Sequence, residues 1–223
     1  MNPPPVLSFD LDDTLWPVAP VIETAERELY VWLQERHPAA VSGHDLETLR
    51  AMRAAVTARH PEHAHDLTFL RHRALKDLFA AAGHPERHAD EALDVFLSAR
   101  NRVTLYDDAR PALERLFKRH RLFALSNGNA DVHRCGIGAL FEGHVTARAA
   151  GAAKPDPRIF THLLEVAGVS AADVVHVGDD PRTDVAGAMQ AGIGAVWINR
   201  DGRTWPRDLA APARTITTLA EIE

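Results

Sequence analysis

Three short, mainly apolar runs in this chain each end abruptly in polar residues. They cover residues 6–9, 121–125 and 174–177. Runs of this length are typical of strands that are buried on both faces of a parallel sheet. The polar residues that follow begin at Asp10, Ser126 and Gly178. Because open parallel sheets bind ligands at the carboxyl ends of their strands, the pattern predicts a site at this edge.

Helical patterns separate these predicted strands. They cover residues 108–120, 156–167 and 181–191. A further apolar run over 195–199 predicts another strand, and strands that alternate with helices indicate a parallel sheet. The helix over 181–191 has clear end signals, because Asp180 is a good N-cap residue, Pro181 suits the first helical position and Gly192 follows the last turn.

The segment between about 20 and 101 departs from this alternation, because it contains long amphipathic stretches and almost no β-branched runs. It predicts four helices, over residues 21–36, 45–59, 66–82 and 86–100. Four such helices make a small bundle. The fold class is therefore predicted as α/β, with a Rossmann-like parallel sheet core over 1–18 and 102–223 and an inserted four-helix domain over 19–101.

Composition narrows the possible partners. Hydrophobic residues make up 46% and charged residues 25% of the 223 residues, which is typical of an ordinary globular protein. The net charge is only -6 with both signs interspersed, so we expect no nucleic-acid or membrane partner. The apolar run 6–9 is too short for a signal peptide or a membrane span, which predicts a cytoplasmic location. The sequence leaves the oligomeric state open and is compatible with a monomer.

Two carboxylates follow the first predicted strand. Asp10 and Asp12 are two residues apart at a strand end, so both side chains can project to the same side. Two like charges so close repel, and a divalent cation would stabilise both ionised forms. A turn or a helix-capping cluster explains the same residues from this segment alone.

Other segments supply the groups that phosphoryl transfer requires. Ser126 and the backbone amides near Asn127 offer hydrogen-bond donors, although Asn-Gly is also an ordinary turn. Lys154 precedes a predicted helix and could hold a phosphate, or could be a solvated surface lysine. Asp179 and Asp184 add carboxylates that suit an octahedral magnesium site.

The order of these segments resembles the haloacid dehalogenase superfamily of phosphatases. The shared motifs are Asp10-x-Asp12-x-Thr14, Ser126-Asn127, Lys154, and Gly178-Asp179-Asp180 with Asp184. The resemblance covers essentially the whole chain, because members of one subgroup insert a helical cap directly after the first motif. It implies that residues 19–101 form such a cap over the site, with the choice of leaving group belonging to the cap.

The resemblance also implies a mechanism. Asp10 would be the nucleophile and would become transiently phosphorylated, while Asp12 would protonate the leaving group and later activate water. Mg²⁺ would be held by Asp10, the Asp12 backbone carbonyl and Asp179, with Asp184 acting through water. The transferring phosphate would be held by Ser126, the Asn127 amide and Lys154, with Thr14 supporting the loop through hydrogen bonds. The resemblance does not assign a definite role in the metal site to Asp180.

Finer features resemble bacterial flavin mononucleotide (FMN) phosphatases, which also hydrolyse a phosphorylated ribitylaminouracil precursor of riboflavin. They lie in residues 12–16, 24–28, 126–129 and 176–180. The implied partner is thus a small phosphate ester. Four residues are candidates for contact with such a ring, although core packing also explains the aromatic ones: Trp16, Phe69, Arg71 and Arg73. A histidine group at 60, 63 and 65 fits a solvated loop better than a transition-metal site.

Two other functions use similar residues. A 2-haloacid dehalogenase shares the fold and the aspartate nucleophile, but carbon chemistry requires neither a metal nor an acid at Asp12. A phosphate-accepting signalling domain also combines aspartates, a hydroxyl residue and a lysine on a parallel sheet. Its phosphorylated aspartate follows a middle strand of the chain, whereas Asp10 follows the first strand here. A non-catalytic phosphate-binding module would not require Asp12.

Overall fold

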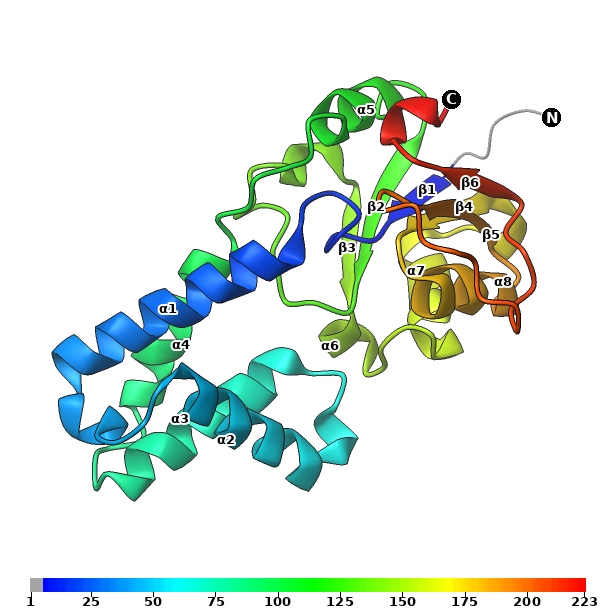
Figure 1. Cartoon of the computed structure of the whole chain (residues 1–223). Coiled ribbons are helices and arrows are strands. Elements are labelled where there is room, and N and C mark those ends of the chain that lie inside the picture. The colour runs from blue at the N-terminus through cyan, green and yellow to red at the C-terminus, as the bar shows by residue number, and fades with distance from the viewer. Residues whose placement is uncertain (1–5) are drawn as a thin grey trace. The chain divides into compact units, whose positions relative to one another are not determined.

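The structure, a computed structural model, describes residues 6–223 and divides into two compact units. The first unit contains the residues up to Pro17 together with Thr104–Glu223, and the second contains Val18–Val103. The chain leaves the first unit after a single strand, forms the mainly helical second unit over Val18–Val103, and then returns to the first unit (Figure 1). The boundaries of the helical insertion expected from the sequence lie within two residues of these.

The first unit is built on a six-stranded sheet. Its strands are β1 (Val6–Phe9), β2 (Arg121–Ser126), β3 (Gly143–Thr146), β4 (Val174–Gly178), β5 (Gly194–Ile198) and β6 (Arg214–Ile216). They lie in the order β3-β2-β1-β4-β5-β6 and every pair is parallel. Phe9 at the end of β1 is level with Ala124 and Val177 on its two neighbours. The three strands predicted to carry polar ends are therefore adjacent, and the predicted α/β fold class is confirmed.

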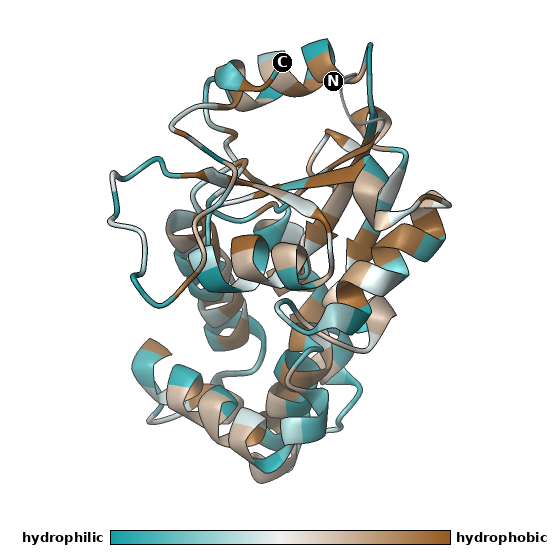
Figure 2. Ribbon diagram, turned by 90° about the vertical axis from the view of Figure 1, so that its right-hand side faces the viewer, coloured by the Kyte–Doolittle hydropathy of each residue, from teal (hydrophilic) through white to brown (hydrophobic). Residues whose placement is uncertain are grey.

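Helices and short helical turns connect these strands. They are α5 (Ala109–Leu116), η3 (Gly138–Leu140), α6 (Ala147–Ala150), α7 (Pro157–Ala167), η4 (Ala171–Asp173), the π-helix η5 (Pro181–Ala186), α8 (Gly187–Gln190) and η6 (Leu219–Glu221). Helix α7 buries Ile159, Phe160 and Leu163 against the sheet residues Phe123 and Leu125. Each fully buried side chain of this kind stabilises the fold by roughly 1.5–3 kcal/mol. Hydrophobic residues are concentrated in the strands (Figure 2).

Three details differ from the sequence prediction. The helix expected over 181–191 begins as a π-helix, in which the amide of Val185 donates to the Asp180 carbonyl at 3.2 Å, and only Gly187–Gln190 is α-helical. Strands β3 and β6 were not predicted, because they are only four and three residues long and have few buried side chains. Helix α5 ends at Leu116 and not at residue 120.

The second unit contains the four predicted helices: α1 (Val18–Arg36), α2 (Leu46–Arg59), α3 (Leu67–Ala81) and α4 (His88–Arg100), with the short turns η1 (Pro38–Val41) and η2 (Pro61–His63). Asp45 and Asp66 accept hydrogen bonds from the first-turn amides of α2 and α3, which explains where these helices begin. A core of its own contains Leu33, Phe79 and Phe96. Across residues 6–223, none of the helices combines the length and apolar character needed to cross a membrane.

Candidate active site

Asp10 lies directly beyond β1 at the carboxyl edge of the sheet. Its amide donates to the Val177 carbonyl at 2.9 Å, which fixes the backbone between β1 and β4. Only 7% of the residue is exposed. Burial raises the pKa of the Asp10 carboxyl well above its ordinary value, and the ammonium group of Lys154 only partly opposes this effect. A carboxylate in this position needs positive charge around it to be ionised at neutral pH.

Lys154 supplies part of that charge. Its Nζ lies 2.5 Å from Asp10 Oδ1 and 2.6 Å from Asp184 Oδ1, and donates to the Leu125 carbonyl at 2.8 Å. Burial alone would lower the pKa of Lys154, but the Asp10 and Asp184 carboxylates outweigh it and hold the pKa above its ordinary value. The solvated surface lysine that the sequence left open is therefore excluded, since Lys154 is 4% exposed.

Asn127 fixes the backbone that carries Lys154. Its side-chain Nδ2 donates to the Lys154 carbonyl at 2.9 Å, and its Oδ1 accepts from the Lys154 amide at 2.7 Å. This two-way pairing joins the loop after β2 to the segment before α7, which are 27 residues apart. Ser126 is buried, and its Oγ accepts from the Gly128 amide at 2.9 Å. Of the residues expected to bind phosphate, Asn127 therefore pairs directly with Lys154, and Ser126 is its neighbour in the chain.

Asp184 lies within the π-helix and Asp180 directly precedes it, and the two side chains have different surroundings. Asp184 is buried, and although burial raises its pKa, Lys154 and His176 together outweigh this effect and hold the pKa below the ordinary value. The Asp180 side chain caps the helix by accepting from the amides of Arg182 and Thr183. A Cβ on Gly178 would lie 2.3 Å from the Asp184 carboxyl carbon, so only glycine at 178 admits this approach. The role of Asp180 is thus explained by capping, as its position before Pro181 predicted.

Asp179 completes a cluster of carboxylates. Oxygen atoms of Asp10, Asp179 and Asp184 lie within 4.8 Å of one another. Burial raises the pKa of Asp179 to about 7, the nearby Asp184 adds to the rise, and Arg203 at 3.0 Å opposes it. The carboxylates of Asp12 and Asp13 also act electrostatically on this cluster, whereas Lys154 and Arg203 are the cations that contact it among the described residues, so negative charge is left for a proton or a metal ion. Oxygen ligands of this type suit a hard divalent cation.

Asp12 is positioned by Trp16. The indole Nε1 of Trp16 donates to Asp12 Oδ1 at 2.8 Å, and the turn between them is closed by the Asp13 amide, which donates to the Trp16 carbonyl at 2.7 Å. Asp13 has a φ of 60°, a left-handed conformation that this tight turn requires. Trp16 is completely buried and has no exposed surface on which a ring could stack. Trp16 thus orients Asp12 in this structure, and its contact with a substrate ring stays a prediction.

Thr14 is held through its backbone and not through its hydroxyl group. Its carbonyl accepts from Arg200 Nη2 at 2.9 Å, whereas its Oγ1 is buried without a hydrogen-bond partner among residues 6–223. Arg200 also pairs with Asp108 at 3.0 Å and lies over the ring of Tyr106, 4.0 Å from its centroid. Arg200 was missed in the sequence because nothing near it in the chain marks it, and its partners lie more than ninety residues away.

A buried histidine behind the site was also missed. His176 on β4 lies 2.8 Å from Ser8 Oγ through Nδ1 and 3.4 Å from Asp184 Oδ1 through Nε2. Burial lowers its pKa, which favours the neutral ring. A polar residue inside an otherwise apolar strand was the available signal, because a buried polar side chain needs a partner.

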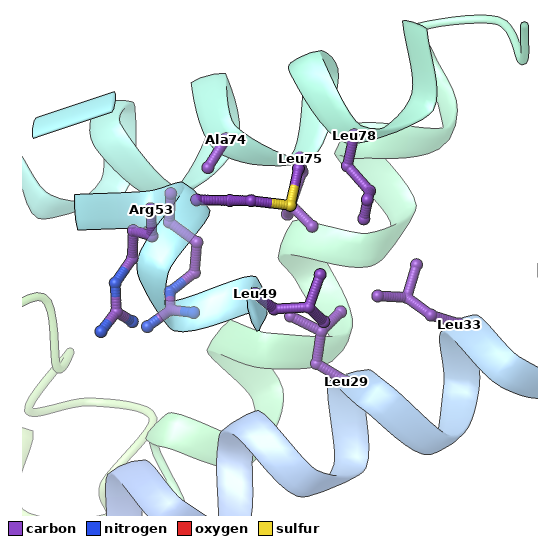
Figure 3. Close-up of a pocket in the computed structure, with 9 residues that line it drawn as sticks. Leu29, Leu33, Leu49, Arg53, Ala74, Leu75 and Leu78 are labelled. Carbon is purple, nitrogen blue, oxygen red and sulfur yellow. The ribbon is translucent and has the colours of Figure 1, made fainter. Parts of the chain in front are cut away.

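The remaining candidates lie on α3 in the helical unit. Arg71 lies over the Phe96 ring at 3.4 Å and 3.6 Å from Glu26, and burial lowers its pKa to about 9. It borders a cavity of about 40 Å³ lined mainly by leucines (Figure 3). Arg73 pairs instead with Asp77 at 2.9 Å, and the Phe69 ring packs on histidine rings of the neighbouring loop. Of these three, Arg71 alone borders this cavity.

Residues 5–192 match the family model described as haloacid dehalogenase-like hydrolase. The chain belongs to this family. The resemblance drawn from the four sequence motifs is thereby confirmed, and the protein is a hydrolase. Among haloacid dehalogenase-like proteins, it is 35% identical to the 5-amino-6-(5-phospho-D-ribitylamino)uracil phosphatase YigB of Escherichia coli K12, over 97% of this chain and 93% of that one. It is 33% identical to a phosphoserine phosphatase of Thermus thermophilus, over 68% and 63%.

Solved structures of the family have the same fold. A 2-haloacid dehalogenase from Pseudomonas syringae pv. Tomato DC3000 superposes with a TM-score of 0.90 at 39% identity, covering 96% of this chain and 94% of that one. A haloacid dehalogenase-like phosphatase from Thermococcus onnurineus has a TM-score of 0.69 at 26% identity, covering 97% and 94%. The relatives that this chain resembles therefore include proteins named as phosphatases and a protein named as a dehalogenase.

Proposed function

We propose that this protein is a metal-dependent phosphatase that hydrolyses small phosphate monoesters through a phosphorylated Asp10. The observation that supports this most is the cluster of Asp10, Asp179 and Asp184, whose oxygens lie within 4.8 Å of one another. Asp10 and Asp184 are buried and both contact Lys154. Attack on carbon by one carboxylate would not require the other two. Attack on a dianionic phosphate requires concentrated positive charge, and this cluster can bind it.

The first step forms a bond between Asp10 and phosphorus. A carboxylate oxygen of Asp10 attacks in line, the bond from phosphorus to the ester oxygen breaks, and its electron pair leaves with that oxygen. Asp12 donates a proton to the departing alcohol. In the second step Asp12 takes a proton from water, the water oxygen attacks phosphorus, and the bond to Asp10 breaks to release inorganic phosphate. Throughout, the charge of Lys154 and the donors near Ser126 offset the charge of the phosphoryl oxygens.

We propose Mg²⁺ as the cation, held by Asp10, Asp179 and the Asp12 backbone carbonyl, with Asp184 acting through water. The fit rests on the donors, which are all hard oxygens, and on the negative charge that Lys154 and Arg203 leave uncompensated among the described residues. When bound, the ion would offset the charge of both nucleophile and phosphate. Lys154 would keep Asp10 oriented, since its Nζ also contacts the Leu125 carbonyl.

The proposed substrate is 5-amino-6-(5-phospho-D-ribitylamino)uracil or FMN. The support is the similarity to YigB, which extends over 97% of this chain. In this proposal the protein acts in the cytoplasm, and residues 19–101 serve as the cap that selects the leaving group. Arg71 is the cap residue to test first, because it borders a cavity and its guanidinium group can donate hydrogen bonds to a ring carbonyl or to an anionic group.

A second candidate is 2-haloacid dehalogenase activity, which is favoured by the TM-score of 0.90 to a protein of that name. In that reaction Asp10 would attack carbon and displace the halide, and water would then cleave the resulting ester. Neither an acid at Asp12 nor a metal ion would be needed. The two candidates share Asp10 as the nucleophile, so the loss of activity in Asp10→Asn alone does not separate them.

The deciding experiment measures both products from one enzyme preparation. Phosphate release from the ribitylaminouracil phosphate, FMN and simple esters is followed with Mg²⁺ and with chelator, and halide release from 2-chloroacids is followed in the same buffers. We expect metal-dependent phosphate release that Asp10→Asn abolishes and Asp12→Asn lowers by about 10²–10⁴-fold. Chelator-resistant halide release without any phosphate release would establish the dehalogenase instead.

A further inference from the structure

A second group of metal-ligating side chains lies within the helical unit. His37 follows the C-terminal end of α1, His88 is the first residue of α4, and Glu91 is one turn further along α4. One ligand atom from each of the three lies within 4.8 Å of the other two. Because residues three apart on a helix lie on the same face, His88 and Glu91 are both directed toward His37. None of the three residues belongs to the proposed active site.

One ring nitrogen of His88 is not satisfied by the described part of the protein. Among residues 6–223, the Nδ1 atom of His88 is buried and has no hydrogen-bond partner. His37 is 9% exposed, and its ring centroid is 4.5 Å from that of His88. A buried ring nitrogen without a partner, as in His88, carries a desolvation cost that a bound ligand would offset. The same three residues line an open hollow together with Trp32, Arg36 and Val95, so a small ligand can enter from solvent.

Several titratable or charged groups surround His37. Burial lowers the pKa of His37, and the neighbouring rings of His88 and His84 lower it further, while Glu91 opposes the change. The charges around the hollow are Glu91, which favours a cation, and Arg36, which opposes one but is itself exposed to solvent.

We propose that His37, His88 and Glu91 form a binding site for a divalent transition-metal ion, with Zn²⁺ as the reference ion. Two imidazoles and a carboxylate, completed by water, are a ligand set that zinc accepts. Metal–nitrogen bonds of about 2.0–2.1 Å place the donor atoms of a tetrahedral site about 3.3 Å apart. The observed spread of up to 4.8 Å thus requires only small side-chain rotations, chiefly of Glu91, which is exposed.

The chemistry of the donors separates this site from the carboxylate cluster of the sheet unit. Imidazole nitrogens favour zinc, cobalt and nickel, whereas Asp10, Asp179 and Asp184 offer only oxygen and suit magnesium. Binding at the helical site would join α1 to α4 beyond their apolar contact. Because an ion that binds only the folded state stabilises it by mass action, we expect Zn²⁺ to raise the melting temperature of the full-length protein.

The test uses the full-length protein in excess Mg²⁺, which competes with Zn²⁺ for the oxygen cluster of Asp10, Asp179 and Asp184. Zn²⁺ binding is measured by calorimetry, and crystals soaked in Zn²⁺ are examined at the zinc absorption edge. We expect an anomalous peak between His37, His88 and Glu91, and binding at least about tenfold weaker in His88→Gln and Glu91→Gln. Glu91→Gln is the variant of choice for folding, because the side chain is exposed and its volume is kept.

The matched controls are His72→Gln and Glu86→Gln, which change the same residue types elsewhere in the helical unit. Both should bind Zn²⁺ as the unchanged protein does. The proposal is overturned if His88→Gln and Glu91→Gln bind Zn²⁺ with unchanged affinity, or if the anomalous peak lies only at Asp10 and Asp179. The outcome is independent of the phosphatase proposal, since the measurement needs no substrate.

Discussion

Lys154 Nζ lies 2.5 Å from Asp10 Oδ1, and the two side chains are 2% and 10% exposed. The same nitrogen lies 2.6 Å from Asp184 Oδ1, so one buried ammonium group is shared by two carboxylates. A pair of this kind is stabilising only while both partners are present, because burying one charge alone is costly. The first prediction follows from this sharing.

Replacing Lys154 by methionine keeps most of the side-chain volume and removes the charge. We expect the free energy of unfolding to fall by about 3–5 kcal/mol in metal-free buffer, because two buried carboxylates lose their cation. Urea unfolding measures this change, and phosphate release measures the accompanying loss of activity. A double variant, Lys154→Met with Asp184→Asn, should recover part of the lost stability, and no recovery would show that the sharing is unimportant.

The pKa of about 7 at Asp179 predicts how magnesium activation depends on pH. Below pH 7 the carboxyl is protonated and cannot bind a cation, so the Mg²⁺ concentration for half-maximal activity should rise as the pH falls through 7. Arg203, 3.0 Å away, lowers this pKa. The variant Arg203→Met should therefore move the midpoint to higher pH. A midpoint that stays in place in this variant would contradict the assignment to Asp179.

The hydrogen bond from Trp16 to Asp12 predicts a specific loss of catalysis. Trp16→Phe removes the indole donor 2.8 Å from Asp12 Oδ1 while the site stays largely filled by an aromatic ring. We expect kcat for phosphate esters to fall by about tenfold, with a smaller change in KM, because Asp12 acts as a proton donor and not in binding. The variant Asp12→Asn should not be impaired much further by adding Trp16→Phe, and additive losses would contradict the coupling.

Glu26 predicts a pH-dependent contribution to the stability of the helical unit. It is 6% exposed and pairs with Arg50 at 2.6 Å and Arg53 at 2.8 Å. Burial raises its pKa, but these arginines outweigh burial and lower the pKa overall. The ion pairs of Glu26 therefore stabilise the folded state at pH values above the ordinary pKa of glutamate. This stabilisation is lost as the pH falls through the lowered pKa of Glu26.

Glu26→Gln should lower the free energy of unfolding by about 1–3 kcal/mol at neutral pH, because Arg71 loses its counter-charge while Arg50 and Arg53 are partly screened by solvent. The difference from the unchanged protein should shrink in acid, where Glu26 is protonated in both states. Glu28→Gln is the matched control, since Glu28 is 45% exposed and pairs with the exposed Arg102. Equal losses in the two variants, measured by urea unfolding, would show that burial of Glu26 is not decisive.

Local patterns in the sequence determined most of the architecture. Consecutive residues predicted the strands β1, β2, β4 and β5, which are apolar runs in the sequence. They also predicted the four helices of the second unit, through apolar periodicity and capping residues such as Asp45 and Asp66. The polar residues at the strand ends also predicted that Asp10 and Asp179 lie close together, because a parallel sheet brings the carboxyl ends of its strands to one edge. The phosphatase role of these residues stays a prediction.

Only the tertiary structure decided which side chains share one environment. Burial separates Asp184, which meets Lys154, from Asp180, which caps a helix, although the two are four residues apart. Distant contacts likewise placed Arg200 on the Thr14 carbonyl and His37 beside His88. The physical reason is that a charge or a pKa depends on neighbours in space, whereas helices and strands depend mainly on neighbours in the chain.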